Sequence, residues 1–275
     1  MLPTSQFIVP RLSLASCVRG IVVRSTMACD LSAEQRLNRY PATPFPTLFL
    51  QLRGESVMVD PWAPEMVCPQ GGALLSGGQT RPTATGNPGA THFMMVLFFP
   101  DALHRLAGLD MNSIVDRFVP LEEVLGADWC GLAAHMVAAG DDQARVAMLE
   151  DFLEPRWRAA RAGGAFDGVV GDWVHRLGAQ AAAAGIGRSA RMVERRIREW
   201  AGQPLRRLRR TYRAEQTFLA ARDGKIPLGD AAQLGGYSDQ SHMSREAREI
   251  SGLSPAEILR RGLEDETYWI YRIWT

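Results

Sequence analysis

The sequence contains little lysine and few cysteines. Lys225 is the only lysine, so arginine carries almost all of the positive charge. We assign this bias no function. The cysteines, Cys17, Cys29, Cys68 and Cys130, are scattered, without a Cys-x-x-Cys pair or a neighbouring histidine cluster. This spacing argues against a zinc site or a disulfide framework and is typical of a reducing cytoplasm.

Long apolar runs are also missing. Arginines interrupt the apolar residues near the N-terminus, at Arg11, Arg19 and Arg24. No segment reaches the roughly 18 consecutive apolar residues of a membrane helix. We therefore expect a soluble, cytoplasmic protein with no membrane partner.

Length and charge divide the chain in two. With 275 residues and 46% hydrophobic content, it is long enough for more than one domain. The segment from Arg176 to Arg261 carries 17 basic and 9 acidic residues, a net charge of +8, and the remainder carries 14 basic and 21 acidic residues, a net charge of −7. A basic part joined to an acidic part is typical of a nucleic-acid-binding unit attached to a unit that does not bind nucleic acid.

The stretch 236–255 predicts the second half of a helix-turn-helix. Asp239, or Ser238 just before it, can cap the start of a helix, and Gly252 can end it. The apolar residues between these caps recur with helical spacing on one inward stripe. They are Met243, Ala247 and Ile250. The opposite face carries hydrogen-bonding side chains suited to a major groove. They are Gln240, Ser241, Ser244, Arg245 and Arg248. An ordinary amphipathic surface helix is the alternative interpretation.

A second copy of this pattern lies 50 positions upstream. Ser189 takes the place of Asp239, and Gly202 takes the place of Gly252. The inward stripe of this copy consists of Val193, Ile197 and Trp200, and its outward face carries Arg191, Arg195 and Arg198. Matched caps, core spacing and arginines indicate two similar helical units more than a chance likeness.

The segment from about Phe166 to Arg261 resembles the DNA-binding domain of the AraC/XylS family of bacterial transcription regulators, which contains two helix-turn-helix units. The motifs that carry this resemblance are Ser189–Ile197, Gly202–Pro204, Arg213–Gln216, Asp230–Ala232 and Gly236–His242. Ile197 and Ala247 depart from the family pattern, which usually has Phe at both positions. The small Ala247 leaves the second unit with less core.

The resemblance implies a sequence-specific transcription regulator that binds double-stranded DNA, and RNA polymerase if it is an activator. It places seven side chains toward the major groove. They are Arg191, Glu194 and Arg195 in the first helix and Gln240, Ser241, Ser244 and Arg245 in the second, with Arg198 and Arg248 completing the outward faces. Glu194 could instead pair with Arg198 four residues later. We expect the two helices to enter successive major grooves about 34 Å apart.

Three further helices are expected in this part of the chain. Residues 173–184 would support the first unit, turning at 185–187, and residues 227–234 would support the second. Residues 204–222 predict a long joining helix that begins with a proline tolerated in the first turn. Its arginines could contact phosphate or form a solvated face. They are Arg206, Arg207, Arg209, Arg210 and Arg213.

Residues 1–118 predict a β-rich, sensor-like domain with a barrel or sandwich, so the chain as a whole is of the α+β class. We interpret Thr47–Leu52 and Ser56–Val59 as a hairpin around Arg53-Gly-Glu. Gly71–Gly78 and His92–Phe99 predict further strands. This part resembles, more weakly, the N-terminal domains of some family members, which implies effector sensing or a homodimer.

Residues 119–165 predict a helical connection and linker. Val146, Leu149 and Leu153 form one stripe of a helix there. The resemblance implies that this region joins subunits or domains, and a helix that only covers its own sheet is the alternative. Arg161–Ala165 is the expected linker.

Residues 166–262 are then the DNA-binding domain, which we expect to fold and bind DNA alone. Residues 263–275 form an aromatic tail, which packs against its own chain or a partner, or is poorly ordered.

Two other functions stay open, a barrel enzyme and a protein-interaction scaffold. Only His92 and His104 lie in the β-rich region, fewer than a cupin-type metal site uses. Neither Ser-His-Asp nor Cys-His order is evident. We therefore assign no catalytic residue, no metal and no cofactor. Trp62 and His92 are the candidates for lining an effector pocket, and a histidine beside Phe93 is more typical of a core or pocket residue than of a metal ligand.

Overall fold

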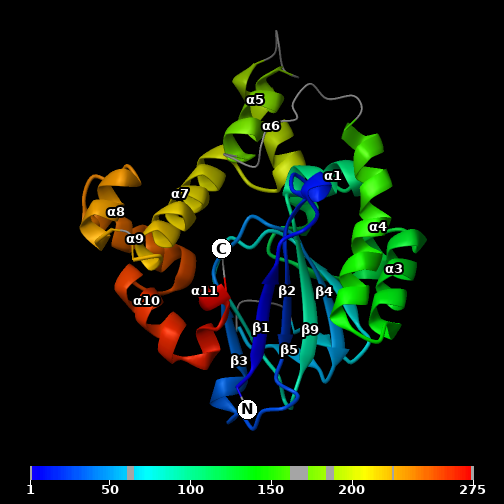
Figure 1. Ribbon diagram of the computed structural model, residues 1–275. Coiled ribbons are helices and arrows are strands. Elements are labelled where there is room, and N and C mark those ends of the chain that lie inside the picture. Colours follow the sequence, from blue (N-terminus) through cyan, green and yellow to red (C-terminus); the bar gives the residue numbers. More distant parts are fainter. Residues whose placement is uncertain (1, 61–64, 162–172, 184–188, 225, 274–275) are drawn as a thin grey trace.

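The computed structural model describes residues 2–60, 65–161, 173–183, 189–224 and 226–273. Two antiparallel sheets make up the N-terminal part, and helices make up the C-terminal part (Figure 1). The predicted α+β class is therefore confirmed. Trp62, the turn at 185–187 and most of the predicted linker lie outside the described residues.

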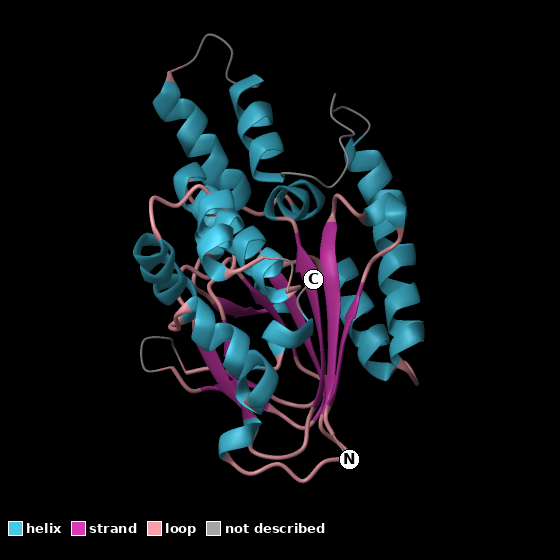
Figure 2. Ribbon diagram, turned by 60° about the vertical axis from the view of Figure 1, so that its left-hand side comes forward, coloured by secondary structure: helices cyan, strands magenta, loops and turns pink. Residues whose placement is uncertain are grey.

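The larger sheet has six strands and the smaller sheet has four, all antiparallel. In spatial order the larger one contains β1 (Thr4–Ile8), β2 (Val18–Ser25), β9 (His92–Phe98), β4 (Thr47–Arg53), β7 (Ala73–Ser76) and β10 (Phe118–Pro120). The smaller one contains β3 (Leu37–Tyr40), β8 (Thr83–Gly86), β5 (Ser56–Met58) and β6 (Val67–Cys68). These two open sheets form no closed barrel, so of the two predicted architectures the sandwich is the nearer one (Figure 2).

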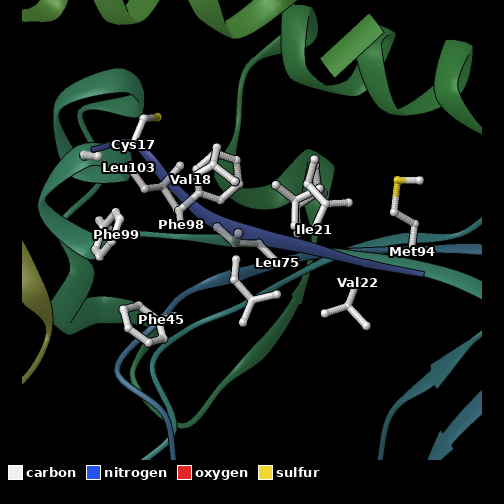
Figure 3. Packing of buried hydrophobic residues seen from close by; sticks show 14 of the residues in the cluster. Cys17, Val18, Ile21, Val22, Phe45, Leu75, Met94, Phe98, Phe99 and Leu103 are labelled. Atoms are coloured by element: carbon white, nitrogen blue, oxygen red, sulfur yellow. The ribbon is translucent and has the colours of Figure 1, made fainter. Parts of the chain in front are cut away.

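Successive side chains of β9 point to opposite faces of the larger sheet, and both faces are buried there. On one face, Phe98 packs edge-on against Trp129, with 6.0 Å between ring centroids (Figure 3 shows this core around Phe98). On the other face, Met95 and Leu97 line the space between the two sheets. A strand buried on both faces needs apolar residues at almost every position, which explains the continuous run in the sequence.

The predicted hairpin between β4 and β5 is wrong. β4 pairs with β7 and β9 in the larger sheet, whereas β5 pairs with β6 and β8 in the smaller one. The chain turns this corner at Gly54, whose φ is +71° and where a Cβ would lie 2.3 Å from the carbonyl oxygen of Ala90. Two short strands flanking a glycine turn look like a hairpin locally, but the partners of each strand lie elsewhere in the chain.

Helices α3 (Ala127–Ala138) and α4 (Asp142–Arg161) cover the outer face of the larger sheet. Helix α2 (Leu121–Val124) packs beside β7 and β10, and α1 (Pro100–Ala107) lies at one end of the sheet, against α4. Leu149 and Leu153 of α4 are fully buried and Val146 is half-buried, as the predicted stripe requires. In Figure 1, α3 and α4 lie across the sheet from the C-terminal helices. Of the two interpretations, a helix covering its own sheet is the one observed within this chain.

The C-terminal part contains seven helices among the described residues. They are α5 (Trp173–Ala183), α6 (Ala190–Ala201), α7 (Leu205–Arg222), α8 (Leu228–Leu234), α9 (Gln240–Ser251), α10 (Pro255–Glu264) and α11 (Ile270–Ile273). Short 3-10 helices, η1 (Leu12–Leu14), η2 (Glu34–Arg36), η3 (Met111–Ile114) and η4 (Glu266–Tyr268), occur at connections. No helix in the described ranges has the length and apolar character that crossing a membrane requires.

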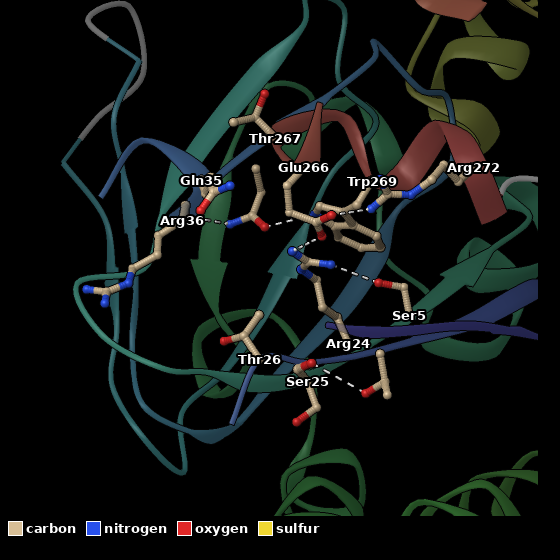
Figure 4. A network of polar contacts seen from close by, with 12 residues as sticks. Ser5, Arg24, Ser25, Thr26, Gln35, Arg36, Glu266, Thr267, Trp269 and Arg272 are labelled. Atoms are coloured by element: carbon tan, nitrogen blue, oxygen red, sulfur yellow. Dashed lines mark hydrogen bonds and ion pairs between the residues drawn. The ribbon is translucent and has the colours of Figure 1, made fainter. Parts of the chain in front are cut away.

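The aromatic tail packs on its own N-terminal domain. Trp269 is fully buried, and its indole N–H donates to Oδ1 of Asn38 at 2.8 Å. Glu266 forms ion pairs with Arg24 at 2.9 Å and with Arg272 at 2.7 Å (Figure 4). The tail thus packs against β1 of the larger sheet and β3 of the smaller sheet.

One hydrophobic core runs through both parts of the chain. It extends from Leu14 in the N-terminal domain to Ile197, Leu208 and Tyr271 in the C-terminal half. A separate small cluster of Ala232, Tyr237 and Met243 lies in the second helical unit. The independent folding of residues 166–262 stays a prediction.

Candidate nucleic-acid interface

Helix α9 begins and ends at the residues that the sequence predicts. The carboxylate of Asp239 accepts a hydrogen bond from the backbone N–H of His242 at 2.7 Å. Because this bond favours the charged carboxylate, the pKa of Asp239 is lowered, first through the His242 N–H and then through the Ser238 hydroxyl. Gly252 ends the helix in the left-handed conformation, with φ +79°.

Helix α6 repeats this geometry. Gly202 ends it with φ +73°, and its N-cap is Ser189, whose side chain makes no capping hydrogen bond. Both α6 and α9 contain 12 residues, offset by the 50 positions of the internal repeat. The structure therefore contains the two similar units that the sequence indicates.

The outward faces of α6 and α9 carry most of the residues predicted to meet DNA. The exposed ones are Arg191, Arg195, Arg198, Gln240, Ser241, Arg245 and Arg248, whereas Glu194 and Ser244 are half-buried. Arg198 lies 3.7 Å from Glu194, so the expected pairing four residues apart does form. The charges of Arg245 and Arg248 contribute to lowering the pKa of Asp239 and of Glu257, respectively.

The joining helix α7 uses two of its arginines to hold α9. Arg213 forms an ion pair with Glu246 at 2.7 Å, and Arg210 pairs with Glu246 at 3.7 Å and with Glu249. Glu246 is buried and also accepts a hydrogen bond from the Tyr237 hydroxyl at 2.7 Å. Sequence reasoning did not identify Glu246, because an acidic residue on an arginine-rich helix usually faces solvent.

Four other arginines lie on α7, and one of them, Arg222, pairs with Asp223 at 3.1 Å. Arg206 and Arg209 are exposed. Arg207 donates to the backbone carbonyl of Thr80 at 3.4 Å and so contacts the N-terminal domain. Arg206 and Arg209 are therefore the α7 arginines best placed for phosphate.

The N-terminal domain contacts the C-terminal end of each outward helix. Gly202, at the end of α6, lies so close to Met111 that a Cβ would be 3.0 Å from the Met111 carbonyl oxygen. At the end of α9, the carbonyl oxygen of Ile250 accepts a hydrogen bond from the backbone N–H of Ala42 at 2.7 Å. The two helices are thus fixed by α7 on one side and by the N-terminal domain on the other.

Trp62 and His92 are the two residues predicted to bind an effector. Trp62 lies outside the described residues. His92 is partly buried, and its Nε2 lies 3.1 Å from a carboxylate oxygen of Asp142. It does not line the apolar cavity between the two sheets.

Residues 182–261 match a family model described as a helix-turn-helix domain. This range contains α6, α7, α8, α9 and most of α10. Residues 182–261 form a helix-turn-helix domain of the AraC type. The helix-turn-helix domain that the resemblance implies is thereby confirmed for this segment. Among curated proteins, none matches the chain.

Solved structures with a similar fold include three of ToxT from Vibrio cholerae. An apo variant from strain SCE256 is 13% identical, with a TM-score of 0.46, covering 87% of this chain and 97% of that one. ToxT from strain O395 bound to (E)-4-(8-methylnaphthalen-1-yl)but-3-enoic acid is 12% identical, with a TM-score of 0.43, covering 82% and 97%. Wild-type ToxT bound to an unsaturated fatty acid is 13% identical, with a TM-score of 0.42, covering 81% and 94%.

Proposed function

We propose that the chain regulates transcription by reading DNA sequence through two helices of its helix-turn-helix domain, α6 and α9. The observation that carries this proposal is the pair of matched helices inside residues 182–261, each presenting exposed arginines on its outward face. An arginine in the major groove can donate two hydrogen bonds to the edge of a guanine. Arg195 and Arg245 occupy equivalent positions of the repeat, so each would read its own half of the site.

Phosphate contact would come from arginines outside the reading faces. Arg206 is exposed on α7 and lies outside the ion pairs with Glu246 and Glu249. A phosphate contact adds affinity for all sequences alike and makes binding salt-dependent. Arg206 would therefore set overall affinity, whereas Arg195 and Arg245 would set sequence preference.

Salt dependence tests this proposal against the enzyme and scaffold alternatives. The full chain is titrated into a fluorescent duplex of random sequence at several salt concentrations, and log Kobs is plotted against log salt. We expect a steep negative slope that becomes shallower by about 0.9 in Arg206→Ala. Arg158→Ala is the matched control, because Arg158 is an exposed arginine on α4, with 74% of its side chain accessible. A flat plot for the wild type would contradict the proposal.

We further propose that the N-terminal domain senses a small molecule between its two sheets. A cavity of about 90 Å³ lies there, lined by Phe49, Met95 and Leu97 and closed by Ile270 from the tail. A ligand in this cavity would touch the same segment that packs beside the helix-turn-helix domain. The test is a thermal-shift screen of apolar molecules against the wild type and Leu97→Trp, in which a sensor site predicts a hit that the variant loses. The homodimer and the contact with RNA polymerase stay predictions of the resemblance.

A further inference from the structure

A second apolar cavity lies at the junction of the N-terminal domain with helix α9. It has a volume of about 110 Å³. Its walls come from the loop after β3, from α7, from α9 and from the tail, with Phe45, Phe218, Met243 and Ile270 among them. It therefore spans the contact at which Ala42 donates to the carbonyl oxygen of Ile250, at the end of a reading helix.

Ala247 explains the empty space. It lies on the inward stripe of α9 between Met243 and Ile250, and all three residues line the cavity. A side chain of a single carbon at the centre of this stripe cannot reach Phe218 across the cavity as a larger one would. Apolar cavities of about 150 Å³ in other proteins bind molecules the size of benzene.

Tyr271 supplies an unused polar group in this wall. The residue is 7% exposed, and its hydroxyl is buried without a hydrogen-bond partner in the described structure. Burial raises the pKa of Tyr271, so the hydroxyl stays protonated and can donate. Buried polar groups are almost always hydrogen-bonded, so an unpartnered donor beside a cavity indicates that an acceptor belongs there.

The charges around the cavity select against anions. Among the residues that the structure describes, the cavity lining includes no lysine, arginine or histidine, and Glu215 is its only carboxylate. Glu215 lies 3.2 Å from Arg19. A carboxylate ligand would be repelled by Glu215, and no described lining residue would offer it a positive charge.

From these observations we propose that the junction cavity is a binding site for a compact, uncharged, apolar molecule of about one aromatic ring that carries a single hydrogen-bond acceptor for Tyr271. Such a ligand would fill the space beside Ala247 and brace α9 against the N-terminal domain. The site adjoins the cavity between the sheets, with which it shares Pro41, Thr43 and Ile270. Binding there does not require that the chain read DNA.

Three probe molecules of similar size test whether the site prefers an uncharged ring that carries one hydrogen-bond acceptor. Acetophenone has a ring and a carbonyl acceptor, ethylbenzene has nearly the same shape without the acceptor, and benzoate adds a charge. Kd values for the full chain are measured by titration calorimetry without DNA. We expect acetophenone to bind about three- to tenfold more tightly than ethylbenzene, the effect of one hydrogen bond, and benzoate to bind more weakly than both. Absence of binding by both neutral probes would overturn the proposal.

Two substitutions place the site. Ala247→Phe should fill the cavity and weaken both neutral probes at least tenfold, while Ala159→Phe, on the exposed side of α4, should leave them unchanged. Tyr271→Phe should remove the preference for acetophenone and leave ethylbenzene binding intact. Ala247→Leu replaces Ala247→Phe in this binding test if the Ala247→Phe variant does not fold. Probe affinities unchanged in a folded Ala247 variant would contradict the assignment, and a failure of DNA binding would leave these results standing.

Discussion

The guanidinium of Arg24 lies over the indole ring of Trp269, 4.5 Å from its centroid. Arg24 is itself buried on β2, where its cost of burial is offset by Glu266 and by the hydroxyl of Ser5, to which it donates at 2.8 Å. The contact joins the second strand of the chain to its last helical segment. It makes the tail part of the N-terminal core.

Trp269→Ala should therefore destabilise the whole chain. The substitution removes a fully buried indole, its hydrogen bond to Asn38 and the ring beneath Arg24, and large-to-small changes of this kind cost about 3–5 kcal/mol of unfolding free energy. Urea unfolding of the full chain measures the loss. Leu263→Ala is the control, since Leu263 is 77% exposed and its loss should change stability by less than about 0.5 kcal/mol. Equal stability of wild type and Trp269→Ala would show that the tail does not belong to the core.

Glu246 and Glu249 form a matched pair, because both contact arginines of α7 but only Glu246 is buried. Glu246→Ala removes the acceptor of Arg213 and of the Tyr237 hydroxyl, and because Arg213 is 33% exposed and remains partly solvated, the cost should be about 1.5–3 kcal/mol. Glu249→Ala removes an exposed pair worth at most about 1 kcal/mol. Urea unfolding followed by hydrogen exchange of α9 compares the two variants. Similar losses in both would contradict the role given to Glu246.

The cap of α9 predicts a pH dependence. The folded-state pKa of Asp239 is lowered by the N–H of His242, so the stabilisation by its charge is present above the unfolded pKa of about 3.9 and is lost as pH falls through the folded pKa. Asp239→Asn keeps an acceptor for the cap but removes the charge. The Tm of the wild type should exceed that of the variant at pH 7, and the difference should shrink below about pH 4. A difference that grows on acidification would contradict this account.

The sequence predicts those features of the structure that depend on residues close together in the chain. The ends of α9 follow from Asp239 and Gly252, because capping is decided by neighbours within one turn. The repeat and its outward arginines follow from spacing in the same way. These local signals were sufficient to find the helix-turn-helix domain.

Contacts between distant segments were not predictable from the residues alone. The β4–β5 hairpin is wrong because strand partners lie far away in the sequence. The burial of Glu246 depends on Arg213, and the position of Trp269 depends on Arg24 and Asn38. A single sequence identifies that an aromatic tail needs a partner, but it does not say which surface supplies it.

The central claim is that α6 and α9 read separate halves of one DNA site, and a randomised-site selection tests it most directly. The full chain and its Arg195→Ala, Arg245→Ala and Arg206→Ala variants each select from a random duplex library. We expect Arg195→Ala and Arg245→Ala to lose base preference at positions roughly ten base pairs apart, a discrimination of about 1–3 kcal/mol each, and Arg206→Ala to keep the wild-type preference with lower affinity. Arg195→Ala should be the more damaging of the two, because the cavity beside Ala247 leaves the second helix less firmly packed. Identical sequence preferences in all four proteins would show that these helices do not read bases.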